Sequence, residues 1–167
     1  MQAQAYPVIE DTARTLVLGL GNTLLQDEGV GVHVIETLVR LAPDTPRVDY
    51  MDGGTLSFTL AGPIGEAAAL IVVDTAQLDA APGTVRVFEG ADMDDFVGNG
   101  RKTSVHEVSL RDLLAISSLE GRLPARRALV GIQPGVMDWG NTPSPAVAAA
   151  IPRACQAVQG LLERWKP

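Results

Sequence analysis

The feature that most constrains the fold is an uninterrupted apolar run at Ala69–Val73, which ends directly in Asp74. Apolar residues without polar alternation are typical of a strand that is buried on both faces, as in the centre of a parallel sheet. A second run of this kind lies at 128–132. Strands of this type need helices on both sides of the sheet, so the chain is predicted to be an α/β protein.

Shorter patterns of apolar residues and turn signals predict the remaining elements. Three more strands are expected at 15–20, 47–51 and 84–88, the second of which runs into a turn signal at 52–55. Helical spacing of apolar residues and helix-starting residues such as Ser109 and proline predict the helices. These helices are expected at 29–42, at 55–60, at 109–119, and from Pro143 or Pro145 to about Trp165.

The order of these elements specifies the topology. Alternating strands and helices favour a mainly parallel sheet between two helical layers. The connection between Asp74 and Thr84 is too short for a helical crossover, so the strand at 84–88 is predicted to be antiparallel. The acidic, glycine-rich segment 89–103 is predicted to be a long, mobile loop. The expected fold is a three-layer α/β/α sandwich on a mainly parallel five-stranded sheet with one antiparallel strand.

Composition sets the class of protein and limits its partners. Apolar residues make up 46% of the 167 residues, which excludes disorder and supports a single domain at 15–167 after an N-terminal extension at 1–14. The net charge of −7 argues against nucleic acid and anionic membranes as partners. No apolar run reaches the length of a membrane span, and residues 1–14 do not resemble a secretory signal. We therefore expect a cytoplasmic protein that is monomeric when free.

Several common types of site are excluded by the sequence. The only cysteine, Cys155, lies among apolar residues of the last predicted helix, so it is expected to pack in the core. One cysteine allows neither an intrachain disulfide nor a cluster of thiolate ligands. Gly19-Leu20-Gly21 begins like a dinucleotide-binding fingerprint, but Leu24 occupies the position of the third glycine. No nucleotide cofactor is therefore predicted.

Polar residues follow the predicted strands at the edge where ligands bind in sheets of this kind. Glu28 lies after the first strand, Asp52 after the second, and Asp74 after the third. His106 follows the antiparallel strand and precedes a helix. Carboxylates and an imidazole that converge in this way form a plausible first shell for a divalent transition metal, with positions left open for water or substrate.

Each of these residues also has a purely structural interpretation. Asp27 fits the N-cap of the first helix, and Glu28 would favour the dipole of that helix. Asp52 fits an ordinary turn before two glycines, and His106 alone is more often a loop histidine than a ligand. Asp74 is harder to explain structurally, since it closes a fully apolar run. His33 falls outside the apolar stripe of its helix and is expected to be exposed.

The residues at 19–31 form the pattern G-x-G-N-x-L-x-x-D-E-G-x-G. This stretch closely resembles the opening of the nickel–iron hydrogenase maturation endopeptidases. The resemblance continues through 52–55, 71–74, 104–107 and 131–134, and it covers residues 15–162 in the same order.

The resemblance implies a specific activity. Enzymes of this family remove a short C-terminal peptide from the hydrogenase large subunit after nickel has been inserted. The metal-binding residues of the family fall on Glu28, Asp74 and His106, and a further acidic residue of the family falls on Asp52. The resemblance also implies that the nickel is carried by the substrate, the large-subunit precursor.

Metal-guided hydrolysis of a peptide bond is the mechanism that these residues favour. Glu28, Asp74 and His106 would hold the nickel, and a water polarised by the metal or by a carboxylate such as Asp52 would attack the carbonyl, an aspartyl-type mechanism. The catalytic set is therefore Asp52, Glu28 and Asp74. Two alternatives remain open: a small-molecule hydrolase with a permanent zinc, and a non-catalytic nickel-binding chaperone.

Overall fold

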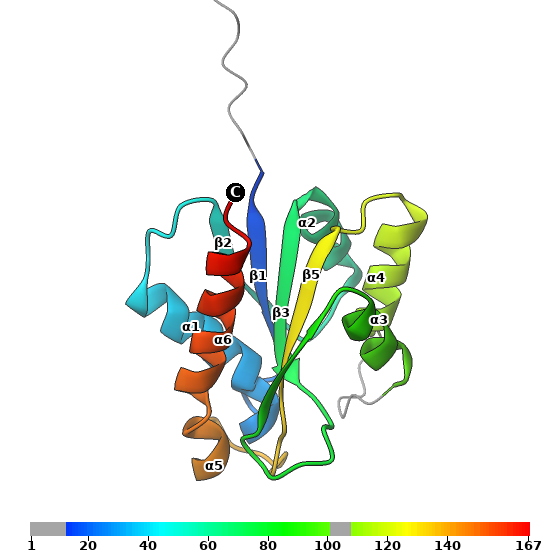
Figure 1. The fold of residues 1–167 in the computed structure, drawn as a ribbon. Coiled ribbons are helices and arrows are strands. Elements are labelled where there is room, and N and C mark those ends of the chain that lie inside the picture. Colours follow the sequence, from blue (N-terminus) through cyan, green and yellow to red (C-terminus); the bar gives the residue numbers. More distant parts are fainter. Residues whose placement is uncertain (1–12, 101–107) are drawn as a thin grey trace, which may run out of the picture.

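The protein is described by a computed structural model that covers residues 13–100 and 108–167. Its centre is a five-stranded sheet in the order β2-β1-β3-β5-β4 (Figure 1). The first four strands in that order are parallel, and β4 pairs with β5 in the antiparallel direction. The strands are β1 (Thr15–Leu20), β2 (Val48–Gly54), β3 (Ala69–Thr75), β4 (Val85–Glu89) and β5 (Arg126–Ile132).

Helices cover both faces of the sheet, as Figure 1 shows. One face packs against α1 (Val30–Leu41) and α6 (Ile151–Arg164). The other face packs against α2 (Ala61–Glu66), α3 (Ala91–Gly98) and α4 (Leu110–Leu119). The predicted three-layer α/β/α sandwich with one antiparallel strand is therefore confirmed. The remaining elements are the 3-10 helices η1 (Gln26–Gly29) and η2 (Phe58–Leu60) and the short helix α5 (Pro145–Ala148).

The central strand β3 divides the core into two halves. Every residue of β3 is buried, as the apolar run predicted. Successive side chains point to opposite faces, so Ile71 and Val73 pack with α1 and α6 while Leu70 and Val72 pack with α2 and α4. Each such side chain contributes about 1.5–3 kcal/mol through burial of apolar surface.

The predicted end of the second strand and the predicted helix at 55–60 were both wrong. The strand β2 continues through Asp52 to Gly54, because β1 pairs with it as far as Leu20 after a shift of register. The helix predicted at 55–60 instead becomes η2 followed by α2, which contains Pro63. Pro63 lies in the first turn of α2, where a missing N–H removes no intrahelical hydrogen bond.

The prediction of a long loop at 89–103 was wrong for residues 91–98, which form α3. Met93 and Val97 are buried, and the ring of Phe96 stacks on Phe88 with 4.2 Å between centroids. Acidic residues in the first turn stabilise a helix rather than break it. Residues 101–107, which include the end of the predicted loop, lie outside the described part of the chain.

The last predicted helix consists of two helices, α5 and α6. Pro152 lies at the start of α6 and has no N–H to continue a helix from α5. The division into a domain at 15–167 and an extension stays a prediction, since residues 1–12 lie outside the described part. No helix within residues 13–100 or 108–167 is both long and apolar enough to cross a bilayer.

Candidate active site

The carboxyl ends of the parallel strands carry three of the predicted site residues. Gly19 pairs with Asp52 on one side and with Val73 on the other, so Asp52 and Asp74 lie at the ends of the two strands that flank β1. Glu28 lies in η1, which contacts β3 at the same edge. The structure thus places Glu28, Asp52 and Asp74 at one edge of the sheet, although they are distant in sequence.

Glycines allow the segment that carries Glu28 to approach the strands so closely. A Cβ atom on Gly31 would lie 2.2 Å from the carbonyl oxygen of Val73 and 2.3 Å from that of Leu20. A Cβ atom on Gly21 would lie 1.8 Å from the carbonyl oxygen of Glu28. Because real Cβ atoms do not make such contacts, η1 and the start of α1 reach the ends of β1 and β3 only with glycine at these positions.

Two of the three carboxylates are buried. The exposed fractions of Glu28 and Asp74 are 3% and 1%. The Oδ1 atom of Asp74 accepts hydrogen bonds from the backbone N–H of Thr75 at 2.7 Å and from its hydroxyl at 3.4 Å. Buried carboxylates are costly, and they recur at sites where a cation or a reacting group supplies compensation.

Asp52 differs from these two residues because it is exposed. Its Oδ1 atom accepts a hydrogen bond from the backbone N–H of Gly54 at 2.8 Å, which fixes the carboxylate at the end of β2. An oriented, solvent-accessible carboxylate at this edge is able to accept a proton from water.

The predicted metal set is only partly covered by the structure. His106 lies outside the described residues. Within residues 13–100 and 108–167, no group of three or more His, Cys, Asp or Glu residues is placed to hold a metal ion. The assignment of Glu28, Asp74 and His106 as metal ligands therefore stays a prediction.

Asp27 is not the helix N-cap that its position suggested. Its side chain is fully buried and faces the loop after β5. Its Oδ2 atom accepts hydrogen bonds from the backbone N–H of Gly135 at 2.8 Å, from that of Val136 at 2.7 Å and from the hydroxyl of Ser144 at 2.8 Å. Its Oδ1 atom accepts one from the backbone N–H of Ser144 at 2.6 Å. Neither η1 nor α1 has a side-chain cap.

These hydrogen bonds determine the protonation state of Asp27. Burial by itself raises the pKa of the carboxyl, but the donors of Val136, Ser144 and Gly135 outweigh burial and leave the pKa below its ordinary value. Asp27 is therefore a buried carboxylate that joins η1 to the loop at 133–144. Sequence reasoning missed this role because all the donors lie more than 100 positions away.

Gln133 is a second connecting residue that the sequence analysis did not single out. It is buried directly after β5, where its Oε1 atom accepts a hydrogen bond from the backbone N–H of Leu78 at 2.7 Å. Its Nε2 atom donates to Oε1 of Gln77, also at 2.7 Å. A polar residue that closes a buried strand was the signal that selected Asp74, and the same signal would have selected Gln133.

Two other sequence expectations are decided by burial. His33 is half-buried rather than exposed, on a helix that contacts both α6 and β2. Its Nδ1 atom lies 3.4 Å from Oε2 of Glu36. Cys155 is buried in the core as predicted, and burial raises the pKa of its thiol.

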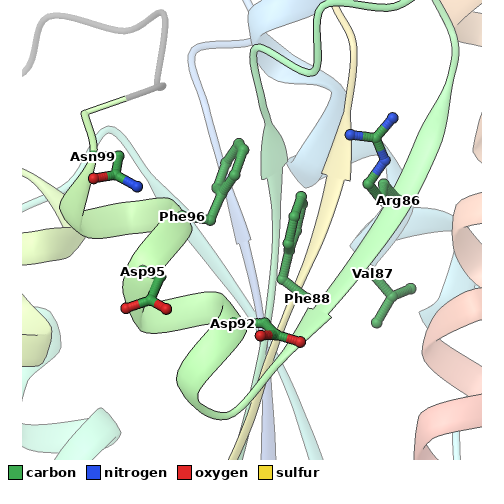
Figure 2. Close-up of a pocket in the computed structure, with 7 residues that line it drawn as sticks. All are labelled: Arg86, Val87, Phe88, Asp92, Asp95, Phe96 and Asn99. Atoms are coloured by element: carbon green, nitrogen blue, oxygen red, sulfur yellow. The ribbon is translucent and has the colours of Figure 1, made fainter.

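A cavity of about 490 Å³ lies between β4 and α3. Figure 2 shows the stacked rings of Phe88 and Phe96 along it. One lining residue, Arg86, lies level with Asp74, because both pair with Gly131 from opposite sides of β5. The lining residues are Arg86, Val87, Phe88, Asp92, Asp95, Phe96 and Asn99.

Comparison with known proteins identifies the family. A family model described as hydrogenase maturation protease matches residues 32–161. The chain belongs to the hydrogenase maturation protease family. It is 37% identical over 153 residues to the hydrogenase expression/formation protein HupD of Rhodobacter capsulatus, which covers 91% of this chain and 72% of that protein. It is 34% identical to the hydrogenase 2 maturation protease of Escherichia coli, which covers 89% of this chain and 90% of that protein.

The solved structures agree with this assignment. The hydrogenase maturating endopeptidase HybD from E. coli matches with a TM-score of 0.81 and 31% identity, over 90% of this chain and 93% of that one. The predicted resemblance is confirmed, and this hydrogenase maturation protease is a peptide hydrolase. The small-molecule hydrolase and the chaperone are not favoured by these relatives.

Proposed function

We propose that this protease removes the C-terminal peptide of a nickel–iron hydrogenase large-subunit precursor after nickel has been inserted. The observation that carries the proposal is the pair of buried carboxylates, Glu28 and Asp74, at the carboxyl edge of the sheet. The backbone of η1 and the start of α1 packs directly against the backbone of β1 and β3, which holds both carboxylates at this edge. Carboxylate oxygens at this edge are suitable ligands for a divalent cation that the substrate brings.

Nickel in the precursor is the cation that suits this site. Glu28 and Asp74 would supply oxygen ligands, and His106 would add the imidazole that a borderline metal such as nickel prefers. The metal then belongs to the substrate, and the protease binds it only together with the precursor. Recognition of the metal would place the scissile peptide bond at a fixed distance from the strand ends.

Hydrolysis needs a group that takes a proton from the attacking water, and Asp52 is the candidate. As the oxygen of water bonds to the carbonyl carbon, the proton passes to a carboxylate oxygen of Asp52. The C–N bond then breaks, and Asp52 returns this proton to the amide nitrogen, which leaves as an amine. The exposure of Asp52 and its fixed orientation by the N–H of Gly54 support this role.

We also propose that the protease works as a monomer in the cytoplasm. The net charge of −7 supports this setting, because like-charged copies of the protein repel one another in solution. The size of the purified protein in solution and its location in fractionated cells test these two points.

Mass spectrometry of the precursor tests the proposed reaction. Nickel-loaded precursor incubated with the wild-type protease is expected to lose the mass of one C-terminal peptide. Nickel-free precursor is expected to keep its mass, because Glu28 and Asp74 then have no cation to bind. Efficient cleavage of the nickel-free precursor would contradict recognition through the metal, and metal analysis of the isolated protease would reveal a resident zinc.

A further inference from the structure

Four large apolar side chains are exposed together beside the candidate active site. The exposed fractions are 56% for Leu24, 45% for Val136, 36% for Met137 and 77% for Trp139. We call these four residues the apolar patch. Single exposed apolar residues are common, but several on neighbouring segments, a tryptophan among them, are typical of an interaction site.

Backbone hydrogen bonds hold the two segments of the apolar patch side by side. The N–H of Gly140 donates to the carbonyl of Leu24 at 3.0 Å, and the N–H of Gln26 donates to the carbonyl of Gly140 at 2.9 Å. The N–H of Asp27 donates to the carbonyl of Val136 at 3.1 Å. Leu24 therefore lies against the loop that carries Val136, Met137 and Trp139.

The carboxylate of Asp27 also holds the loop that carries the apolar patch. This fully buried group accepts hydrogen bonds from Gly135, Val136 and Ser144, which enclose the exposed part of the loop on both sides. A loop that is ordered before binding loses less conformational entropy when a partner seats on it. The buried carboxylate of Asp27 therefore keeps the loop in a conformation in which Val136, Met137 and Trp139 are exposed.

Position connects the apolar patch with the active site. Asp27, which anchors the loop, immediately precedes Glu28 in η1. One bound polypeptide could therefore cover Leu24 and Val136 and also reach the carboxylates at the strand ends. We propose that the apolar patch is the docking surface for an apolar segment of the hydrogenase large-subunit precursor next to its cleavage site, an inference that rests on the function proposed above.

The size of the apolar patch favours the precursor over a second copy of this chain. A stable protein–protein interface takes about 20–30 residues from each side, far more than four side chains provide. The precursor gains the remaining contacts at the active site itself. A few aromatic and apolar anchors that carry most of the binding energy are typical of such surfaces.

Steady-state kinetics with nickel-loaded precursor test the proposal. Trp139→Ala is expected to raise KM by roughly tenfold or more, with kcat within about twofold of the wild type. Met137→Ser is expected to raise KM in the same direction. Leu119→Ala is the matched control, since Leu119 is 89% exposed at the end of α4, on another part of the molecule, and its replacement is expected to leave KM unchanged.

A direct binding titration separates this proposal from the proposed function. If the wild type binds nickel-loaded precursor without cutting it, the proposed reaction fails, while weaker binding by Trp139→Ala still supports docking. If Trp139→Ala and Met137→Ser both bind and cut like the wild type, the docking proposal is wrong. A wild-type dimer that Trp139→Ala converts to a monomer would assign the apolar patch to self-association and would also overturn the proposal.

Discussion

Asp27 accepts hydrogen bonds from both donors of Ser144, its backbone N–H and its hydroxyl, which lie 117 positions later in the chain. The backbone N–H of Ser144 lies 2.6 Å from Oδ1, and its hydroxyl lies 2.8 Å from Oδ2. Glu28, a candidate metal ligand, follows Asp27 directly in η1. The hydrogen bonds to Ser144 therefore hold η1 against the start of α5. The loop between β5 and α5 is thereby tied to the active-site edge.

Asp27→Asn tests how much this connection contributes to stability. An amide of the same shape turns an NH2 group toward buried N–H donors, which leaves at least one of those donors without an acceptor. We expect the free energy of unfolding, measured with urea, to fall by about 3 kcal/mol. Asp95→Asn, at an exposed position on α3, is the control and should change it by less than about 0.5 kcal/mol.

Gly31→Ala tests the close approach of α1 to the sheet. The added Cβ would meet the carbonyl oxygens of Val73 and Leu20, which belong to strand backbones that cannot move aside. We expect a large loss of stability or an outward shift of η1, with loss of precursor cleavage in either case. Gly160→Ala on α6 is the matched control, because nothing lies within 4 Å of its added Cβ. This variant should raise the free energy of unfolding by up to about 1 kcal/mol.

Asp74→Asn separates a functional carboxylate from a structural one. The variant keeps an oxygen that accepts the N–H of Thr75 and removes the negative charge. We expect a thermal unfolding temperature close to that of the wild type, together with a strong loss of cleavage of nickel-loaded precursor. An unfolded variant would instead show that the charge of Asp74 is needed for the fold.

The predictable part of this structure is local in sequence. The run at 69–73 predicted β3, and the short connection before Thr84 predicted an antiparallel β4, because each depends on neighbouring residues alone. The carboxyl-edge rule placed Glu28, Asp52 and Asp74 at one edge, since parallel strands end together. The role of Asp27 was not predictable in this way, because its hydrogen-bond donors lie in a loop more than 100 positions later in the sequence.

Helix α3 was missed for a different reason. Its acidic residues and glycines suggested a loop, whereas Met93, Phe96 and Val97 have the spacing of a helical face. Packing of Phe96 on Phe88 and the hydrogen bond from Nε of Arg127 to Oδ1 of Asp94 at 2.8 Å attach this helix to β4 and β5. Such tertiary contacts outweigh the weak local preference of the segment.

The start of α4 gives a prediction of pH dependence. The backbone N–H and hydroxyl of Ser109 donate to Asp112 at 2.9 Å and 2.7 Å, which holds the pKa of that carboxyl below its ordinary value. Stabilisation from such a group is complete above the ordinary carboxyl pKa and is lost as the pH falls through the lower folded value. Wild-type stability should therefore fall more steeply than that of Asp112→Asn below about pH 4. In a Ser109→Ala background, Asp112→Asn should have less effect, which unfolding at several pH values would measure.

Cys155→Ala tests whether this protease uses a nucleophile of its own. The thiol is buried in α6, its Sγ atom lies 3.9 Å from the carbonyl oxygen of Val34, and burial raises its pKa, so little thiolate exists near neutral pH. We expect the variant to cleave nickel-loaded precursor at close to the wild-type rate, at a cost of about 1 kcal/mol in stability. Thiol-alkylating reagents should leave the folded wild type active for the same reason. A variant that folds normally but no longer cleaves would contradict attack by water and assign the reaction to the cysteine.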